Sequence, residues 1–426
     1  MALSRIWSFF ILSALLVASF KFFLIGDTEV FNHMVTGKSD DAYAITHPPG
    51  SDGMIETCAS AVTISLKLIG IMTFFMGLMR IAERAGGINL LSRIIAPFFS
   101  RLFPDLPKNH PAMGHMMMNF SANLLGLDNA ATPFGIKAMQ SMQDLNSNSK
   151  TASNAQIMFL CLHASGLTLI PVSIIAARAA LQSASPTEIF IPSLIATFSA
   201  TVAAMLLVSW RQKINLLRLP ILLWIGGISS FIALLVLYTS SMDSSGVQSF
   251  SGILSNGIIL MILLLIVLGG LYKRINIFDA FIDGAKGGFE TAVRIIPYLV
   301  GILVAISLLR TSGTFDLLIG GLKTVFSSVG MDTRFVDGLP TALIKPFSGS
   351  GARGMMISTM ESFGPDSFAG RLSCILQGSS DTTFYVVAVY FGAVGISNTR
   401  YSVPMMLLAD LVGIITSIAL CYLFFA

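Results

Sequence analysis

Charged residues are scarce in this sequence: only 11% of its 426 residues are Asp, Glu, Lys or Arg, whereas 54% are hydrophobic. Soluble domains carry about 25% charged residues, and the mean hydropathy here is +0.78. This composition indicates a polytopic membrane protein rather than a set of soluble domains. The net charge of +4 is small and dispersed, so we predict no nucleic-acid partner.

Cysteine is also rare, with four residues that lie mostly within apolar runs. They provide neither a disulfide framework nor a CxxC metal or redox site. The sequence has no HExxH, no Walker A motif and no GxGxxG between a strand and a helix. His110 and His115 have the wrong spacing for a metal pair on one helical face. We therefore predict no bound metal, no cofactor and no enzymatic activity.

Apolar runs define the expected membrane spans. They lie near 6–25, 54–79, 155–180, 188–209, 220–239, 252–271, 289–309, 370–396 and 402–425. Two further apolar segments, 111–140 and 340–360, are broken by Gly, Pro and polar residues. The first run resembles a signal peptide, but no small-residue cleavage site follows it, so we expect an uncleaved span. The predicted fold is an all-α polytopic membrane protein with discontinuous or re-entrant helices in the lipid bilayer, and a homo-oligomer stays open.

The chain also contains an internal repeat. IETCASAV at 55–62 resembles FETAVRII at 289–296, and CLHASGLTLIPVS at 161–173 resembles ILQGSSDTTFYVV at 375–387. In the same order, NFSANLLGLDNAATPFG at 119–135 and KPFSGSGARGMM at 345–356 are both broken, polar segments. We predict an N-terminal span and external loop at 1–52, a first repeat at 53–209, two connecting spans at 210–278 and a second repeat at 279–426.

The distribution of charge indicates how the repeats are oriented. The loops 26–53 and 240–250 are mainly acidic and are expected outside the membrane. Basic clusters follow the second and fifth runs and precede the seventh, and these loops are expected inside. The repeats would then be inverted, as in many secondary transporters. Basic residues between 310 and 345 do not fit this scheme and favour a parallel duplication instead.

The broken segments carry polar residues where lipid would be expected, and irregular backbone at that depth needs a protein or water-filled environment. Asp128 or Asn129 could cap a second half-helix, and Ser348 and Ser350 could be caps or ligand contacts. Arg353 adds positive charge that suits an anionic group, although Gly and Ser here could also serve helix packing. The candidate binding residues of the first repeat are Asn119, Asn123, Asp128, Asn129, Thr132, His163, Ser165 and Thr168.

The second repeat offers a polar run at 377–383. Helical spacing would place Gln377, Ser380 and Asp381 on one face, and the repeat aligns His163 with Gln377 and nothing charged with Asp381. Two such faces would meet in a shared site, where Asp128 and Asp381 could bind Na⁺ or H⁺ and His163 could titrate. The candidates of the second repeat are Ser348, Ser350, Arg353, Gln377, Ser379, Ser380, Asp381 and Thr382.

Several motifs also resemble a known family. NLLGLDNAATPFGIKAMQSM (123–142) is similar to the signature of the spore maturation A proteins. IPYLVGILVAISLLRTSG (296–313), KPFSGSGARGMM and LQGSSDTTFYVV (376–387) are similar to that of the spore maturation B proteins. The chain resembles a fusion of the two, within the nucleoside-recognition or Gate group. The resemblance implies a role in membrane transport, and the broken segments lack the intramembrane cysteine that the ferrous iron transporters of this group use.

Together these features predict a secondary transporter or permease in a bacterial cytoplasmic membrane. Its substrate would be a small polar or anionic solute or an ion, with possible H⁺ or Na⁺ coupling. A non-transporting envelope scaffold is the alternative, and it would pack the two polar faces without a wet pocket. HASG at 163–166 is also similar to the GASG motif of intramembrane serine proteases, which would require a histidine nitrogen within hydrogen-bond reach of Ser165.

Overall fold

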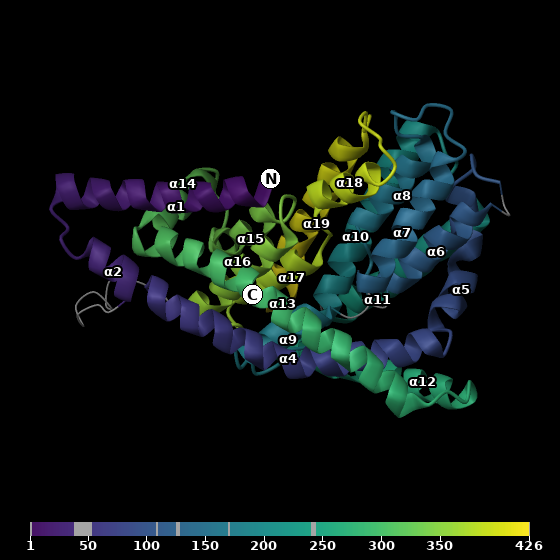
Figure 1. Cartoon of the computed structure of the whole chain (residues 1–426), viewed down its shortest axis with the longest axis horizontal. Coiled ribbons are helices and arrows are strands. Elements are labelled where there is room, and N and C mark those ends of the chain that lie inside the picture. The colour runs from purple at the N-terminus through teal and green to yellow at the C-terminus, as the bar shows by residue number, and fades with distance from the viewer. Residues whose placement is uncertain are drawn as a thin grey trace. The chain divides into compact units, whose positions relative to one another are not determined.

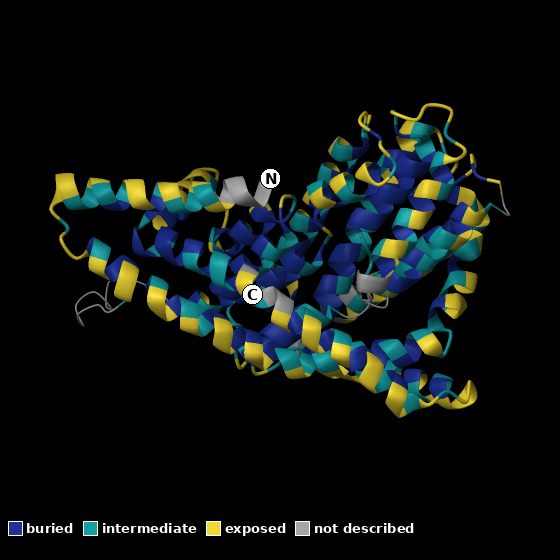
Figure 2. Cartoon of the chain, viewed as in Figure 1, coloured by how far each residue is buried: buried dark blue, intermediate teal, exposed yellow. Residues whose placement is uncertain are grey.

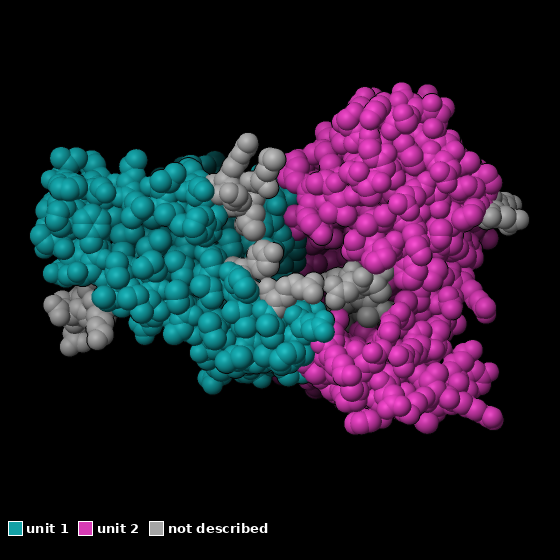
Figure 3. All heavy atoms as spheres, viewed as in Figure 1, with its two compact units in different colours: residues 1–72, 173–186, 288–377 teal, residues 73–172, 187–287, 378–426 magenta. Residues whose placement is uncertain are grey.

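The computed structural model describes residues 2–37, 53–107, 110–124, 128–168, 171–239 and 244–425. These residues form helices and one isolated bridge between Thr151 and Asn398, and no strand is present among them. They divide into two compact units, coloured separately in Figure 3. Unit 1 comprises residues 1–72, 173–186 and 288–377, and unit 2 comprises residues 73–172, 187–287 and 378–426.

Unit 1 contains the N-terminal helices and residues 288–377 of the second half of the chain. Its elements include the first part of α4 (Met54–Arg84), the later part of α13 (Ile277–Thr311), α1 (Ala2–Phe20), a π-helix (Lys21–Ile25), α2 (Val30–Thr36), α9 (Val172–Ala180), α14 (Thr314–Ser328), a 3-10 helix (Arg334–Gly338), α15 (Leu339–Ile344), α16 (Gly349–Phe363) and α17 (Phe368–Gly378).

Unit 2 contains most of the first half of the chain and its C-terminal helices, many of which appear in teal and yellow in Figure 1. Besides the remaining parts of α4 and α13, its elements are α5 (Gly87–Leu102), α6 (Pro111–Leu124), α7 (Asp128–Gln143), α8 (Asn154–Ala164), α10 (Phe190–Gln212), α11 (Leu219–Thr239), α12 (Ser244–Tyr272), α18 (Thr383–Gly392) and α19 (Ser402–Phe425).

The two halves of the chain show the same order of elements. A long helix, α4 or α13, is followed by a shorter helix and then by two interrupted pairs, and each half ends with a long helix, α10 or α19. The matching helices α8 and α17 even begin alike, because Ser153 and Ser367 each accept a hydrogen bond from the backbone N–H three residues on. The predicted repeat boundaries stay predictions, but this order agrees with a duplicated chain.

Each unit mixes elements from both halves. In the first half, α8 lies in unit 2 while α9, which follows it, lies in unit 1. In the second half, α17 lies in unit 1 and α18 lies in unit 2. Within unit 2, α10 of the first half packs against α19 of the second. Each of these interrupted pairs therefore contributes one helix to each unit.

Among the described residues, five helices are long and apolar enough to cross a membrane. They are Trp7–Ile25, Met54–Arg84, Phe190–Gln212, Ile253–Tyr272 and Ser402–Phe425. A sixth candidate is the pair Leu299–Thr311 and Thr314–Ser328, which is bent by 72°. Figure 2 shows exposed residues along the outer helices, and many of them are large and apolar, as expected for a surface that contacts lipid.

Two predicted spans are wrong as single runs. The stretch 155–180 is divided between α8 and α9, and 370–396 is divided between α17 and α18. The interruptions coincide with Gly166 and Pro171 in the first case and with Gly378 and the Ser-Ser-Asp segment in the second. Such residues favour turns and caps over helix interiors, so apolar composition alone overestimated the length of these helices.

Candidate functional site

His163 lies in the last turn of α8, a helix whose side chains are buried on every side. A capping box fixes the start of this helix: Ser153 Oγ accepts from the Gln156 N–H at 3.3 Å, and Gln156 Oε1 accepts from the Ser153 N–H at 2.8 Å. The imidazole is 4% exposed. A polar ring buried in this way requires hydrogen-bond partners.

Two asparagines of α6 supply these partners. The Nδ1 atom of His163 lies 3.0 Å from Asn119 Oδ1 and 2.8 Å from Asn123 Nδ2. The Asn119 Nδ2 group donates to the Ala131 carbonyl at 2.7 Å, which leaves Asn119 Oδ1 to face the ring as an acceptor. The Asn119 contact requires a proton on His163 Nδ1, whereas the contact with Asn123 Nδ2 requires Nδ1 to be unprotonated. His163 can thus bond one asparagine or the other, according to the tautomer of its ring.

The other ring nitrogen faces a carboxylate. His163 Nε2 lies 3.9 Å from Asp381 Oδ2, and Asp381 follows α17 in the second half of the chain. The Asp381 N–H donates to the Ala164 carbonyl at 2.6 Å, while Asp381 Oδ1 accepts from the Thr382 N–H at 2.6 Å. Backbone contacts thus hold Asp381 beside the end of α8, so the pair is a built feature of unit 2.

This pair has an asymmetric exposure. The His163 side chain is 5% exposed, whereas that of Asp381 is 51% exposed. Protons on both ring nitrogens would create an imidazolium, and the Asp381 carboxylate would offset part of the cost of burying that charge. With Nε2 unprotonated, both facing atoms are acceptors and need a donor between them. The arrangement can hold either a proton or a small donor group beside a half-exposed carboxylate.

The structure corrects the expected geometry of the second polar run. Ser379, Ser380 and Asp381 lie outside the helices, so the predicted helical face of Gln377, Ser380 and Asp381 is wrong. The alignment of His163 with Gln377 is a correspondence between the repeats, and the residue of the second run that faces His163 is Asp381. His163 and Asp381 meet because the interruption after α17 leads the chain to the end of α8.

The remaining candidates in unit 2 have simpler roles. The Ser165 hydroxyl donates to the Leu162 carbonyl at 3.0 Å, which is a local turn bond. Ser379 and Thr382 are buried, whereas Thr132, Thr168 and Ser380 are half-buried. The side chains of Asp128 and Asn129 lie outside the described residues.

Four candidates lie in unit 1 and form their own group. Ser348 is the expected cap, since its Oγ accepts from the Gly351 N–H at 3.0 Å, and Ser350 Oγ lies 3.3 Å from it. Gln377 Nε2 donates to the Gly349 carbonyl at 3.5 Å, and the Lys345 ammonium donates to the Gln377 carbonyl. Arg353 is half-buried on α16. These four residues thus form a group within unit 1, and the single shared site stays a prediction.

Sequence reasoning missed Tyr390 of α18. Its ring packs edge-on against His163, with centroids 4.8 Å apart. A Cβ at Gly135 would overlap the Tyr390 ring and the Asn119 carboxamide, so Gly135 allows α7 to approach both. Tyr390 stands within an apolar run and gives no signal in the sequence, but Gly135 lies directly within the recognised 123–142 motif.

Sequence reasoning also missed a buried ion pair in unit 1. Arg178 of α9 is 0% exposed and its Nη2 lies 2.8 Å from Asp366 Oδ1. Arg178 also donates to the Pro365 and Ser185 carbonyls and to Ser183 Oγ. Burial would raise the pKa of Asp366, but hydrogen bonds from Ser183 and Ala184 and the Arg178 charge lower it below its usual value. An arginine that ends an apolar run is the one signal that could have indicated this contact.

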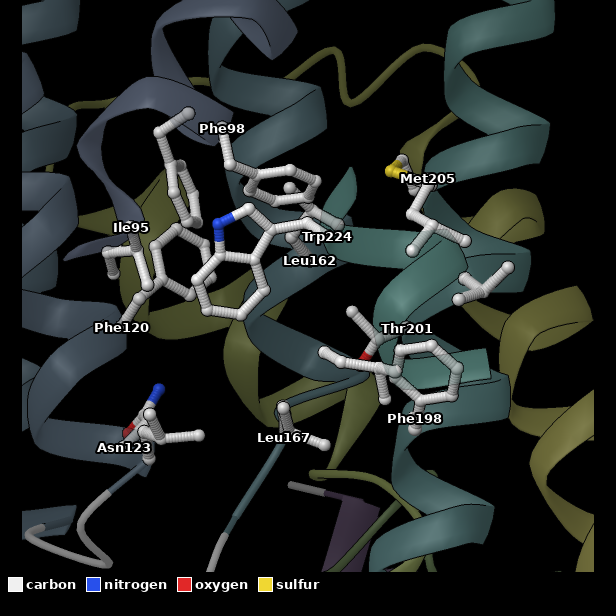
Figure 4. Close-up of a pocket in the computed structure, with 16 residues that line it drawn as sticks. Ile95, Phe98, Phe120, Asn123, Leu162, Leu167, Phe198, Thr201, Met205 and Trp224 are labelled. Carbon is white, nitrogen blue, oxygen red and sulfur yellow. The ribbon is translucent and has the colours of Figure 1, made fainter. Parts of the chain in front are cut away.

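An apolar pocket in unit 2 lies next to His163 and the asparagines that contact it. Its lining residues come mainly from α5, α6, α10 and α11 (Figure 4). They include Asn123, which contacts His163, and Leu162, which precedes His163 in the chain. No group of three or more His, Cys, Asp or Glu side chains suited to a metal ion occurs in the described part of the chain.

Comparison with known proteins identifies the family. The Gate model, described as nucleoside recognition, matches residues 65–181 and 292–397, which together make up more than half of the chain. Spore maturation protein A of Bacillus subtilis (strain 168) is 45% identical over 157 residues, covering 37% of this chain and 80% of that protein. Spore maturation protein B of the same organism is 46% identical over 172 residues, covering 40% of this chain and 95% of that protein.

These two relatives match different halves of the chain. No solved structure matches it significantly. The duplicated order of helices, the membrane-spanning helices and the two matched regions agree with one another, and the chain therefore belongs to the Gate family as a multi-pass membrane protein related to spore maturation proteins A and B.

Proposed function

We propose that the protein is a secondary transporter or permease for a small polar or anionic solute, in the cytoplasmic membrane of a bacterium. The observation that carries this proposal is the His163–Asp381 pair, in which Nε2 and Oδ2 are 3.9 Å apart at two chain interruptions. Ionisable groups within membrane-embedded bundles are costly and mark ion or substrate pathways. A packing role alone would not need a carboxylate that is half exposed.

We further propose that the two halves are inverted repeats. In unit 1, Thr57 near the start of α4 and Arg310 near the end of α13 line the same small cavity. In unit 2, Arg84 at the end of α4 lies 2.7 Å from Asp283 near the start of α13. The start of each long helix thus lies near the end of the other, as expected for antiparallel equivalents in an inverted repeat.

Proton coupling would follow from the chemistry of the pair. A proton on His163 Nε2 is stabilised by Asp381, and a solute donor that bonds Asp381 would compete with it. Binding of the solute and of the proton would then be linked, which is the requirement for a coupled transporter. Na⁺ at Asp381 is the alternative coupling ion.

Uptake into proteoliposomes tests the proposal. Purified protein would be assayed with radiolabelled nucleosides, dicarboxylates and amino acids under an imposed pH or Na⁺ gradient. Asp381→Asn and His163→Gln should each reduce gradient-driven uptake by about tenfold or more, because each removes a charge-assisted contact. Asp144→Asn, at an exposed position after α7, should leave uptake unchanged. Uptake that ignores both gradients, with full activity in Asp128→Asn and Asp381→Asn, would rule out the coupling.

A non-transporting scaffold is the second candidate, and one observation favours it. Ser165, Ser379 and Thr382 are nearly fully buried, as they would be in a dry helix interface. A scaffold would show no uptake of any solute in the panel above the level of protein-free liposomes. It would also keep its folding and envelope association in Asp381→Asn.

A further inference from the structure

The apolar pocket of unit 2 has a volume of about 120 Å³ and is partly open. Figure 4 shows the rings of Phe98, Phe120 and Trp224 lying together on one side, with Asn123 below them. Phe99 and Phe198 also line the pocket, so five of the sixteen lining residues are aromatic. The wall contains few polar side chains, chiefly Asn123 and Thr201.

Aromatic contacts lead from this pocket to His163. The Phe98 and Trp224 centroids are 5.9 Å apart, and those of Phe99 and Phe120 are 4.5 Å apart. Phe120 contacts Phe159 at 5.6 Å, and Phe159 in turn lies 6.0 Å from the His163 ring. A group bound in the pocket would therefore act on the same packed cluster that positions His163.

The two polar side chains differ in their availability. The Thr201 hydroxyl already donates to the Ser165 and Thr197 carbonyls. Asn123 contacts His163 through one end of its carboxamide, and a carboxamide offers two donors and two acceptor positions in all. Asn123 is therefore the group that could bond a polar substituent of an occupant.

We propose that this pocket binds a small solute with one aromatic ring and one hydrogen-bonding substituent. The ring would lie among Phe98, Phe120 and Trp224, and the substituent would bond Asn123. The volume is comparable with that of an apolar cavity of about 150 Å³ that accepts benzene, and the open side of the pocket leaves space for a substituent. This inference rests on the proposed function in one respect: the solute that binds the pocket is taken to be the solute that the protein transports.

A ring fits this pocket better than a lipid acyl chain. Aromatic side chains interact with other rings through stacked and edge-to-face contacts that an acyl chain cannot provide. A polar side chain also lines the pocket next to His163, whereas an acyl chain offers nothing that could bond it. The acyl chain remains as an outcome that the experiment must separate.

Trp224 makes binding directly measurable. The sequence contains three tryptophans, and Trp7 and Trp210 are 41% and 76% exposed, so Trp7→Phe and Trp210→Phe would leave Trp224 as the single reporter. In detergent, 4-bromophenol should quench its fluorescence through bromine along a saturable curve. Phenol without bromine should restore the fluorescence by competition. Circular dichroism would confirm that each variant is folded.

Matched substitutions on α10 locate the site. Val202 lines the pocket, and Val202→Phe should weaken 4-bromophenol binding by about tenfold or more, because it overfills the space. Leu206, on the same helix, is half exposed and outside the lining, so Leu206→Phe should change binding less than about twofold. Asn123→Leu should abolish the preference for 4-bromophenol over bromobenzene, which we expect to be a few-fold.

Each result decides one question. Unsaturable quenching, or saturable quenching that Val202→Phe leaves intact, overturns the inference whatever the uptake assay shows. Lipids brominated on their acyl chains give the third outcome. If they quench Trp224, phenol does not relieve the quenching and 4-bromophenol shows no saturable binding, the pocket is a lipid site and the inference is overturned. Saturable binding that responds to Val202→Phe supports it, even if no solute is transported and the proposed function fails.

Discussion

Replacing the buried Arg178 with alanine should destabilise unit 1 more than replacing an exposed arginine with alanine. The guanidinium is fully buried and bonds Asp366, Ser183 and two backbone carbonyls. Removing one partner of a buried ion pair costs about 3–5 kcal/mol because the other charge stays behind without compensation. Asp366 is 33% exposed, so water would stabilise its charge in part, and we expect about 2–4 kcal/mol.

Thermal unfolding in detergent micelles, followed by circular dichroism, measures this loss. The matched control is Arg334→Ala, since Arg334 pairs with Asp332 at the same 2.8 Å but both side chains are largely exposed. Such exposed pairs contribute about 0–1 kcal/mol. If both variants unfolded at the same temperature, the contact between α9 and the segment before α17 would not stabilise the protein, and the reasoning from burial would be refuted.

The same contact predicts a pH dependence. The pKa of Asp366 is lowered in the folded protein, so its contribution to stability is complete above the ordinary carboxyl value near 3.8 and decreases as the pH falls through the lowered value. The fall in stability below about pH 4 should be shallower in Asp366→Asn than in the unsubstituted protein. Equal slopes in the two proteins would contradict the assignment.

Two further substitutions test unit 2. Gly135→Ala should destabilise the protein by about 1–3 kcal/mol, because the added methyl overlaps Tyr390. The control, Gly114→Ala, has open space around it and should stabilise the protein by about 0.5–1 kcal/mol. A Gly135→Ala protein that is more stable than the unsubstituted one would contradict the packing argument. Thr383→Val should lower the free energy of unfolding by about 1–3 kcal/mol, because the Thr383 hydroxyl donates to the buried Asp410 carboxylate at 2.6 Å. An unchanged thermal unfolding temperature would show that this hydrogen bond is dispensable.

Composition predicted the all-helical membrane fold, because lipid leaves few alternatives to apolar helices, and the resemblance of several motifs indicated the Gate family. Composition and these motifs also indicated a broken segment at 340–360 with Ser348 as a cap or a ligand contact, since Gly-Ser segments have strong local preferences. They could not predict that His163 contacts Asp381. That contact depends on which unit each half-helix joins, and local preferences carry no information about it.

The pocket illustrates a second limit. Phe98, Phe120 and Trp224 belong to three different helices, and each reads in the sequence as ordinary core or lipid-facing residues. Only their convergence beside Asn123 distinguishes them. Asn123 itself was predicted because it lies in the broken, polar segment 119–135.

The exchange of helices between halves leads to a final prediction about the divided chain. His163 and Arg178 belong to the first half, whereas Asp381 and Asp366, which they contact, belong to the second. Separate expression of residues 1–239 and 244–426 would leave each half without these contacts and would expose the surface at which α10 packs against α19. We expect each half alone to aggregate or be degraded, and the two expressed together to copurify at equal amounts. Two proteins that match different halves already exist as separate chains in Bacillus subtilis (strain 168). If either half were stable and monomeric alone, the exchanged contacts would contribute little to folding, and the charge pairs would have to be explained by function only.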